Sequence, residues 1–236
     1  LGLSSFQLSD NKRGFSFESN KSLNMEMGIN DNSAYDVINT LDKKHLANII
    51  KVLGDEKDGK LIANKIDRYR KSKFIKTSKE LASIIKSAKK NYSNYKKNPA
   101  TKTFQALRIF VNKELTELIT GLIQATKILS SNGKLVVVSF HSIEDKIVKN
   151  FFNLYSSIKK NPSRYLPIDE TKVIFFKEVI KKPLIPSKQE VEENKNSRSA
   201  KLRFGTRNEE LFSDSTDFEN IFNNYSELER LHIWES

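Results

Sequence analysis

Residues 133–145, with the sequence GKLVVVSFHSIED, constrain the fold of this chain more than any other segment. The continuous apolar run at residues 135–138 follows a glycine, which is the pattern of a strand buried on both faces of a parallel sheet. Polar residues come next, and Ser142 and Asp145 have the spacing of a helix capping box. The segment therefore predicts a strand, a turn and a helix in direct succession.

Ser139 and His141 are candidate catalytic residues because of their position after this strand. Ligands of open α/β sheets bind outside the carboxyl ends of the strands, and both residues stand there. Ser142, Glu144 and Asp145 also have a structural interpretation, since cap residues and first-turn acids stabilise a helix without any catalysis. His141 is required by neither the predicted cap nor the core, so a catalytic and a structural role both stay open for it.

Length and composition exclude several classes of protein. The 236 residues are 37% hydrophobic, which leaves room for one α/β domain and a smaller lobe. No apolar run approaches the length of a membrane span and no signal sequence opens the chain, so we expect a soluble protein with no membrane segment. The lack of cysteine excludes disulfides and thiolate metal sites and suits the reducing cytoplasm. The three histidines are too scattered to predict a metal site.

The net charge of +12 is unevenly distributed along the chain. Residues 41–100 hold 17 Lys and Arg against 6 Asp and Glu, whereas residues 208–236 hold 1 against 8. The first of these segments would attract a polyanion, and nucleic acid is the partner that such an excess indicates. The alternative is that the lysines reflect an A·T-rich genome and are merely solvated.

Apolar residues at helical spacing predict a small helical lobe over residues 41–97. Gly54 is placed to end the first helix, and Thr77 with Glu80 forms a capping box before the third. The residues that define the three apolar faces are Leu41, Leu46, Ile49, Ile50 and Leu53, then Leu61, Ile62, Ile66 and Tyr69, then Leu81, Ile84 and Ile85.

The lobe is flanked by segments that predict an α/β body, residues 1–40 and 98–207. From Phe104 to Ala125 the apolar spacing predicts one long helix that leads to the central strand, and a helix follows that strand. Residues 173–180 and 200–204 predict two further strands, separated by a short helix capped at Ser187. This order resembles the second half of a Rossmann-like methyltransferase sheet. The acidic residues 208–236 are predicted to be an appendage.

Five motifs resemble those of the MraW family, also called ribosomal RNA small subunit methyltransferase H. They are GLSSFQ at residues 2–7, RGFSF at 13–17, PATKTFQALRI at 99–109, SFHSIEDKIVK at 139–149 and SRSAKLR at 197–203. The resemblance implies a class I fold that binds S-adenosylmethionine and is interrupted by a helical substrate-recognition insert. It also implies methyl transfer to the exocyclic N4 of a decoding-region cytidine in 16S ribosomal RNA of the small ribosomal subunit.

The sequence also departs from the family pattern in two places. The family's glycine-rich cofactor loop would precede this chain, which has no initiating methionine, so we expect an upstream portion to be missing and cofactor binding by the 236 residues alone to be weak. Residues 24–28 read NMEMG where the family usually has Asp-Met-Arg-Met-Asp. A catalytically silent RNA-binding protein derived from the family is therefore the alternative function.

The target chemistry and the motifs together give a set of candidate site residues. The lone pair of cytosine N4 is delocalised into the ring, so a catalyst must orient the amine and accept hydrogen bonds from its protons. Candidate acceptors are Ser4, Ser5, Ser139 and His141. By resemblance Gln7 contacts the cofactor, with Leu1 and Gly2 beside it. Candidate RNA-contacting residues are Arg13, Phe15, Phe17, Arg68, Arg70, Lys71 and Arg108; ordinary packing is the alternative for the two phenylalanines.

Overall fold

The computed structural model of the protein describes residues 1–236 apart from Ser5, 8–9, 11–12, Ile29, Asp31, 90–97, 157–173, 213–215 and 232–236. Contacts between the described parts divide the chain into two compact units. Unit 1 comprises Leu1–Gly2 and Glu117–Asn223, and unit 2 comprises Leu3–Thr116 and Asn224–Ser236. Among the described helices, none combines the length and the apolar character that crossing a membrane requires.

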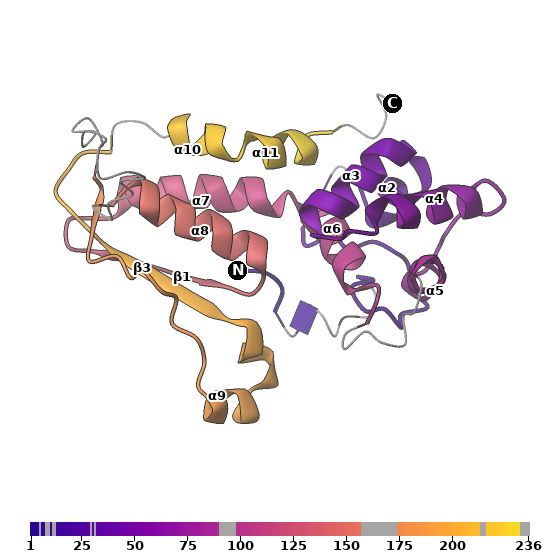
Figure 1. Ribbon diagram of the computed structural model, residues 1–236, viewed down its shortest axis with the longest axis horizontal. Helices are drawn as coiled ribbons and strands as arrows, with labels where there is room; N and C mark the ends of the chain where they lie inside the picture. The colour runs from indigo at the N-terminus through magenta and orange to yellow at the C-terminus, as the bar shows by residue number, and fades with distance from the viewer. Residues whose placement is uncertain are drawn as a thin grey trace, which may run out of the picture. The chain divides into compact units, whose positions relative to one another are not determined.

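Unit 2 is built from helices, which Figure 1 labels. Their bounds are α2 Ala34–Thr40, α3 Lys43–Leu53, α4 Gly59–Arg70, α5 Ser78–Ala88 and α6 Thr101–Asn112, with the later α11 at Asn223–Glu229. Each of α3, α4 and α5 lies where apolar spacing predicts a helix, and each buries most of that apolar face. The exception is Leu61 of α4, which is predicted on the apolar face but is 54% exposed. Burial of these leucines and isoleucines supplies the hydrophobic free energy of the unit.

The ends of these helices follow local chemistry. Asp42 caps α3 by accepting hydrogen bonds from the backbone of Lys44 at 2.7 Å and of His45 at 3.4 Å. Gly54 ends α3, and a Cβ there would lie 2.5 Å from the carbonyl oxygen of Lys102, so no larger residue fits. Thr77 caps α5 as predicted.

A buried ion pair links three segments of unit 2. The Lys89 ammonium group donates to the Glu56 carboxylate at 2.5 Å and to the carbonyl oxygen of Pro99 at 2.7 Å. The Lys89 and Glu56 side chains are only 2% and 6% exposed. Glu56 also accepts a hydrogen bond from the backbone of Asp58. The pair thus ties the end of α5 to the α3–α4 connection and to the start of the α6 segment.

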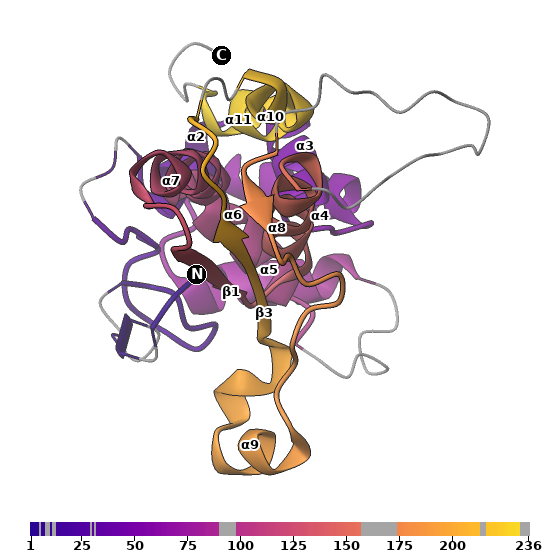
Figure 2. The same cartoon turned by 90° about the vertical axis from the view of Figure 1, so that its left-hand side faces the viewer.

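Unit 1 contains a sheet of three antiparallel strands, β1 Lys134–Ser139, β2 Phe176–Lys177 and β3 Lys201–Arg207, in the order β1-β3-β2. Val136 pairs with Phe204 in the register of β1 and β3. The other elements are α7 Glu114–Ile128, which belongs to this unit from Glu117 onward, α8 Ser142–Leu154, α9 Lys188–Glu193, the 3₁₀ helix η2 Lys195–Ser199 and α10 Thr216–Ile221. Helix α8 packs on β1 and β3, and α9 projects beyond the start of β3 (Figure 2).

Three predictions about secondary structure are corrected. The β1 strand pairs antiparallel in the described sheet, and Val136 is 53% exposed, so the strand is not buried on both faces. The predicted long helix is two helices, α6 and α7, because Lys113 adopts the left-handed conformation at φ +49°. The strand predicted at 173–180 is described only as β2, and Glu178 at φ +53° follows its end. Val173 lies outside the described residues.

The core of unit 1 is aromatic. Phe151 of α8 packs edge-on against Phe152, Tyr155, Phe176 and Phe218, with ring centroids 4.9–5.7 Å apart. Phe218 belongs to α10 and is fully buried. The prediction that residues 208–236 are merely an appendage is therefore wrong for α10, because this aromatic side chain completes the core.

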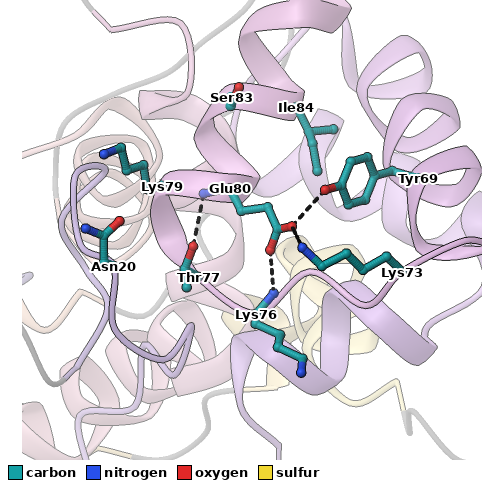
Figure 3. A pocket seen from close by; sticks show the side chains of 9 residues that line it. All are labelled: Asn20, Tyr69, Lys73, Lys76, Thr77, Lys79, Glu80, Ser83 and Ile84. Carbon is teal, nitrogen blue, oxygen red and sulfur yellow. Dashed lines mark hydrogen bonds and ion pairs between the residues drawn. The ribbon is translucent and has the colours of Figure 1, made fainter.

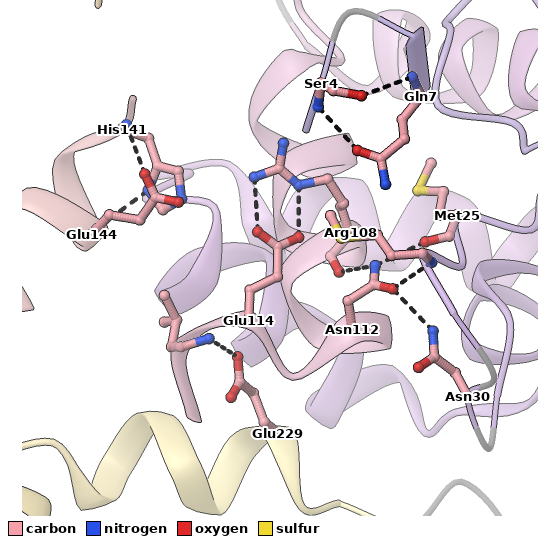
Figure 4. Close-up of polar contacts among 12 residues, drawn as sticks. Ser4, Gln7, Met25, Asn30, Arg108, Asn112, Glu114, His141, Glu144 and Glu229 are labelled. Carbon is pink, nitrogen blue, oxygen red and sulfur yellow. Dashed lines mark hydrogen bonds and ion pairs between the residues drawn. The ribbon is translucent and has the colours of Figure 1, made fainter. Parts of the chain in front are cut away.

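The buried residues of the acidic segment also include Glu229 of α11, which lies in unit 2 (Figure 4). Its carboxylate accepts hydrogen bonds from the backbone of Leu115 at 3.0 Å and Thr116 at 2.8 Å, and from the Thr116 hydroxyl at 2.6 Å. Burial raises the pKa of Glu229 to about 7, against the lowering effect of these donors and with a further increase from Glu114. The carboxyl group thus caps the first turn of α7 while titrating near neutrality.

Replacing Lys89 by Met should destabilise the protein by about 3–5 kcal/mol, because Glu56 would be left as a buried, unpaired charge. Urea unfolding monitored by circular dichroism measures the change. The Lys71→Met control, at an exposed ion pair with Asp67, should change stability far less. The double variant Lys89→Met with Glu56→Leu should recover most of the loss. Equal stability of Lys89→Met and the control would contradict this role of the pair.

Glu229 should make stability fall as pH rises from about 4.5 to about 7. In this window the folded protein retains a proton that the unfolded chain has released, so each increment of pH favours unfolding, by up to about 3 kcal/mol in total. In Glu229→Gln the difference in unfolding free energy between the two ends of the window should shrink. If the unfolding free energies of the variant and the parent change with pH in parallel, Glu229 keeps its ordinary pKa.

Candidate functional site

The turn between β1 and α8 is built around His141. This residue is the N-cap of α8, and its Nδ1 accepts a hydrogen bond from the backbone of Glu144 at 3.4 Å. The Glu144 carboxylate reaches back to the backbone N–H groups of Phe140 at 2.9 Å and His141 at 3.3 Å (Figure 4). These reciprocal bonds form a capping box one residue earlier than the predicted pair of Ser142 and Asp145. The prediction that no cap requires His141 is therefore wrong.

The cap determines which nitrogen of His141 can carry a proton in the neutral ring. Because Nδ1 accepts a bond, the proton of the neutral imidazole belongs on Nε2. That nitrogen is buried and has no well-aligned hydrogen-bond partner among the described residues, although Glu144 Oε1 lies 3.2 Å from it. An under-satisfied buried N–H beside a buried carboxylate is a polar group that a ligand could complete.

Other predicted residues of unit 1 gather at this turn. Ser139 is 2% exposed, and its hydroxyl donates a long hydrogen bond of 3.4 Å to the carbonyl oxygen of Lys201. The backbone nitrogen of Leu1 donates to the carbonyl oxygen of Val138 at 2.9 Å. A Cβ on Gly2, which has φ +80°, would lie 3.9 Å from Glu144 Oε1. Leu1, Gly2, Ser139 and His141 are therefore brought together at the carboxyl end of β1.

A charge network fixes α8 on β3 behind this turn. Asp145 accepts from Arg203 at 2.7 Å and from Lys201 at 3.0 Å, and Arg203 is 5% exposed. Burial acts to raise the pKa of Asp145, but the hydrogen bonds from Arg203 and Lys201 outweigh it and hold the pKa below its ordinary value. The SFHSIED and SRSAKLR motifs are thus joined in space by an ionised, paired carboxylate.

In unit 2, Ser4 and Gln7 bond to each other. The backbone of Ser4 donates to the Gln7 side-chain oxygen at 2.9 Å, and the backbone of Gln7 donates to the Ser4 hydroxyl at 3.2 Å (Figure 4). This exchange fixes the predicted cofactor-contacting amide relative to the backbone of its own loop. Ser5, the remaining predicted acceptor, lies outside the described residues.

The loop that carries Arg13, Phe15 and Phe17 is held by packing. The Arg13 guanidinium contacts Asp10 at 3.2 Å and donates to two carbonyl oxygens of residues 26–27. Phe15 is 7% exposed, and the Phe17 ring packs edge-on against Phe104 at 4.8 Å. Stacking on a base would require Phe15 to leave the core. In the structure Phe15 therefore has the packing role that was the alternative to RNA contact.

Asn112 is a positioning residue that the sequence does not reveal. Its side chain donates to the carbonyl oxygens of Met25 and Arg108, both at 2.8 Å, and accepts from the backbone of Met27 at 2.8 Å and from Asn30 at 2.9 Å (Figure 4). The loop at 24–28, which departs from the family pattern, is thus fixed through its backbone. An asparagine at a helix end gives no pattern from which this contact could be predicted.

Two predicted RNA-contacting arginines are engaged inside unit 2. Arg108 forms a bidentate pair with Glu114, at 2.7 and 3.0 Å, and is 17% exposed. Arg70 is 12% exposed, pairs with Asp67 at 3.0 Å and donates to the carbonyl oxygen of Ile38 at 2.9 Å. The Arg70 guanidinium is therefore directed into the unit and is already occupied by these acceptors. Arg68 and Lys71 are exposed, and Lys71 pairs with Asp67 at 3.2 Å.

Comparisons with known proteins show which family the sequence resembles. The model of the MraW methylase family matches residues 1–208. Similar relatives called ribosomal RNA small subunit methyltransferase H occur in Afipia carboxidovorans, Sulfurihydrogenibium sp. and Oenococcus oeni, at 44%, 44% and 45% identity. The matches cover 88%, 88% and 86% of this chain but 62%, 66% and 65% of the relatives, so the chain spans slightly less than two thirds of their length. On this agreement over most of its residues, the chain belongs to the MraW methylase family.

Proposed function

We propose that the chain is part of an S-adenosylmethionine-dependent methyltransferase that acts on 16S ribosomal RNA, at the exocyclic N4 of a decoding-region cytidine. The family match and the names of the relatives support the reaction class. One structural observation carries the proposal. Residues of three family motifs, at 2–7, 139–149 and 197–203, meet in unit 1 at the carboxyl end of β1, where α/β enzymes bind their ligands.

The residues at this turn fit a polar organic cofactor. Gly2 has a positive φ, and an added Cβ would meet nothing nearer than 3.9 Å, so ligand atoms could approach the backbone there. The buried Nε2–H of His141 and the Glu144 carboxylate offer a donor and an acceptor beside it. S-adenosylmethionine supplies, when bound, a methyl group on a positively charged sulfur. Leu1 and Gly2 are the residues of this turn that we propose to hold it, and the family resemblance of the motif at residues 2–7 adds Gln7.

The capping bonds determine what His141 can contribute. While Nδ1 accepts from the backbone of Glu144, the neutral ring presents only a donor, so His141 is a positioning residue in this conformation. The Glu144 carboxylate, 3.2 Å from Nε2, would hold the ring in place and stabilise any positive charge that it gains. Ser139 is the neighbouring hydroxyl that could accept a hydrogen bond from the target amine.

Methyl transfer by the full-length gene product tests the proposal. Radiolabelled S-adenosylmethionine and a 16S decoding-region fragment should give labelled RNA, and mass spectrometry of the nucleosides should identify N4-methylcytidine. A fragment with uridine in place of the target cytidine is the matched control, because it lacks the exocyclic amine. RNA binding without any methyl transfer would instead support the alternative, a non-catalytic RNA-binding protein.

His141→Ala and His141→Asn separate the cap from the chemistry. Both remove the imidazole, but Asn is a good N-cap and should keep stability close to that of the parent, whereas Ala should cost about 0.5–2 kcal/mol. If the imidazole positions the reacting groups, single-turnover methyl transfer should fall by about 100-fold or more in both variants. Recovery of the parental rate in His141→Asn would show that the residue only caps α8.

A further inference from the structure

Unit 2 contains an open pocket of about 550 Å³ between α4, α5 and the loop at Asn20 (Figure 3). Three lysines, Lys73, Lys76 and Lys79, line it together with one acidic residue, Glu80. The lining groups therefore carry three positive charges against one negative charge. A concave site of this size and sign suits a small anionic group better than the broad surface of a double helix.

The single carboxylate in the pocket is already engaged. Glu80 accepts from the Tyr69 hydroxyl at 2.7 Å, from Lys73 Nζ at 3.2 Å and from the backbone of Lys76 at 2.9 Å (Figure 3). Burial acts to raise the pKa of Glu80, but these donors outweigh it and hold the pKa below its ordinary value. Glu80 is therefore ionised and neutralised mainly by Lys73.

Lys76 and Lys79 remain as uncompensated cations. Both are exposed, and across the described ranges neither ammonium group forms an ion pair. Their backbones are nevertheless fixed, because Lys76 accepts from the backbone of Leu23 at 3.3 Å and Lys79 donates to the carbonyl oxygen of Ser19 at 3.1 Å. The two charges thus project from an ordered wall, which is what a built binding site requires.

The remaining lining groups have the chemistry of nucleotide recognition. The Tyr69 ring offers a face for stacking, and the Asn20 amide offers both a donor and an acceptor (Figure 3). The Tyr69 hydroxyl is held by Glu80, so the ring is oriented before any ligand arrives. Unpaired bases in RNA are recognised in this way, by aromatic stacking and hydrogen bonds to their edges.

We propose that this pocket binds one unpaired nucleotide of single-stranded RNA, with Lys76 and Lys79 on its backbone phosphate and Tyr69 against its base. The inference rests on the proposed function, which supplies RNA as the substrate class. It adds a binding subsite for that RNA in the helical unit of the protein. It moves the expected RNA contact away from Arg70 of α4, a predicted RNA-contacting residue that pairs with Asp67 and donates to Ile38.

Fluorescence anisotropy with a short, unstructured, labelled oligoribonucleotide tests the pocket in the full-length protein. Lys76→Ala with Lys79→Ala should weaken binding by about tenfold or more at low salt. It should also flatten the plot of log affinity against log salt by roughly 0.7, since both lysines contact the same phosphate and each phosphate neutralised on a single strand contributes about 0.7. The matched control is Lys43→Ala with Lys44→Ala, two exposed lysines at the start of α3 in the same unit. The control should keep the parental affinity and slope.

Further arms separate the possible outcomes. Cytidine monophosphate should compete much more weakly than the oligonucleotide; competition at equal concentration would overturn the assignment to an RNA strand in favour of a free nucleotide. Equal loss of affinity in both double variants, with unchanged melting temperatures, would overturn the proposal that the pocket binds RNA. Methyl transfer by the parent protein is measured in the same preparation. Its absence while the two variants still differ would refute the proposed function and leave the pocket standing.

Discussion

The ion pair between Asp145 and Arg203 is the interaction on which the candidate site depends. Arg203 is nearly buried on β3, and a buried guanidinium is tolerated only where an anion and further acceptors satisfy it. Asp145 supplies that anion from the first turn of α8. Because this pairing sets where α8 begins relative to β3, it also sets where His141 and Glu144 lie. Losing either partner would cost about 3–5 kcal/mol and release the turn.

The turn itself joins structure and chemistry in one set of bonds. A serine or aspartate would cap α8 at least as well as His141, since those residues lead the N-cap preferences. The imidazole adds a second nitrogen, and here that nitrogen lies 3.2 Å from the buried Glu144 carboxylate. The capping box therefore presents a polar pair that a simpler cap would lack, and this physical difference is the reason to assign His141 a positioning role.

Sequence patterns predict the parts of this fold that depend on neighbours in the chain. Apolar spacing places α3, α4 and α5, and the caps at Thr77 and Ser187 are where hydroxyl and acid spacing puts them. Sequence patterns do not predict the position of a side chain when a residue far away in the sequence determines it. Arg70 turns inward because the carbonyl oxygen of Ile38 accepts from it, and Phe218 is buried because Phe151 lies opposite. For the same reason, no sequence pattern near Asn112 predicts its role, because it binds loop residues that are far away in the sequence.

The charged residues of unit 2 also show what the sequence alone does not predict, namely which cations are already paired. A count of 17 basic against 6 acidic residues over positions 41–100 predicts a polyanion partner but does not say which lysines are available. The structure assigns the acids: Glu56 neutralises Lys89, Asp67 pairs with Arg70 and Lys71, and Glu80 pairs with Lys73. Each pairing removes a cation from the surface that could bind a phosphate. The binding potential of the unit therefore depends on the cations that these acids leave uncompensated, and around the pocket those are the ammonium groups on the wall formed by the start of α5.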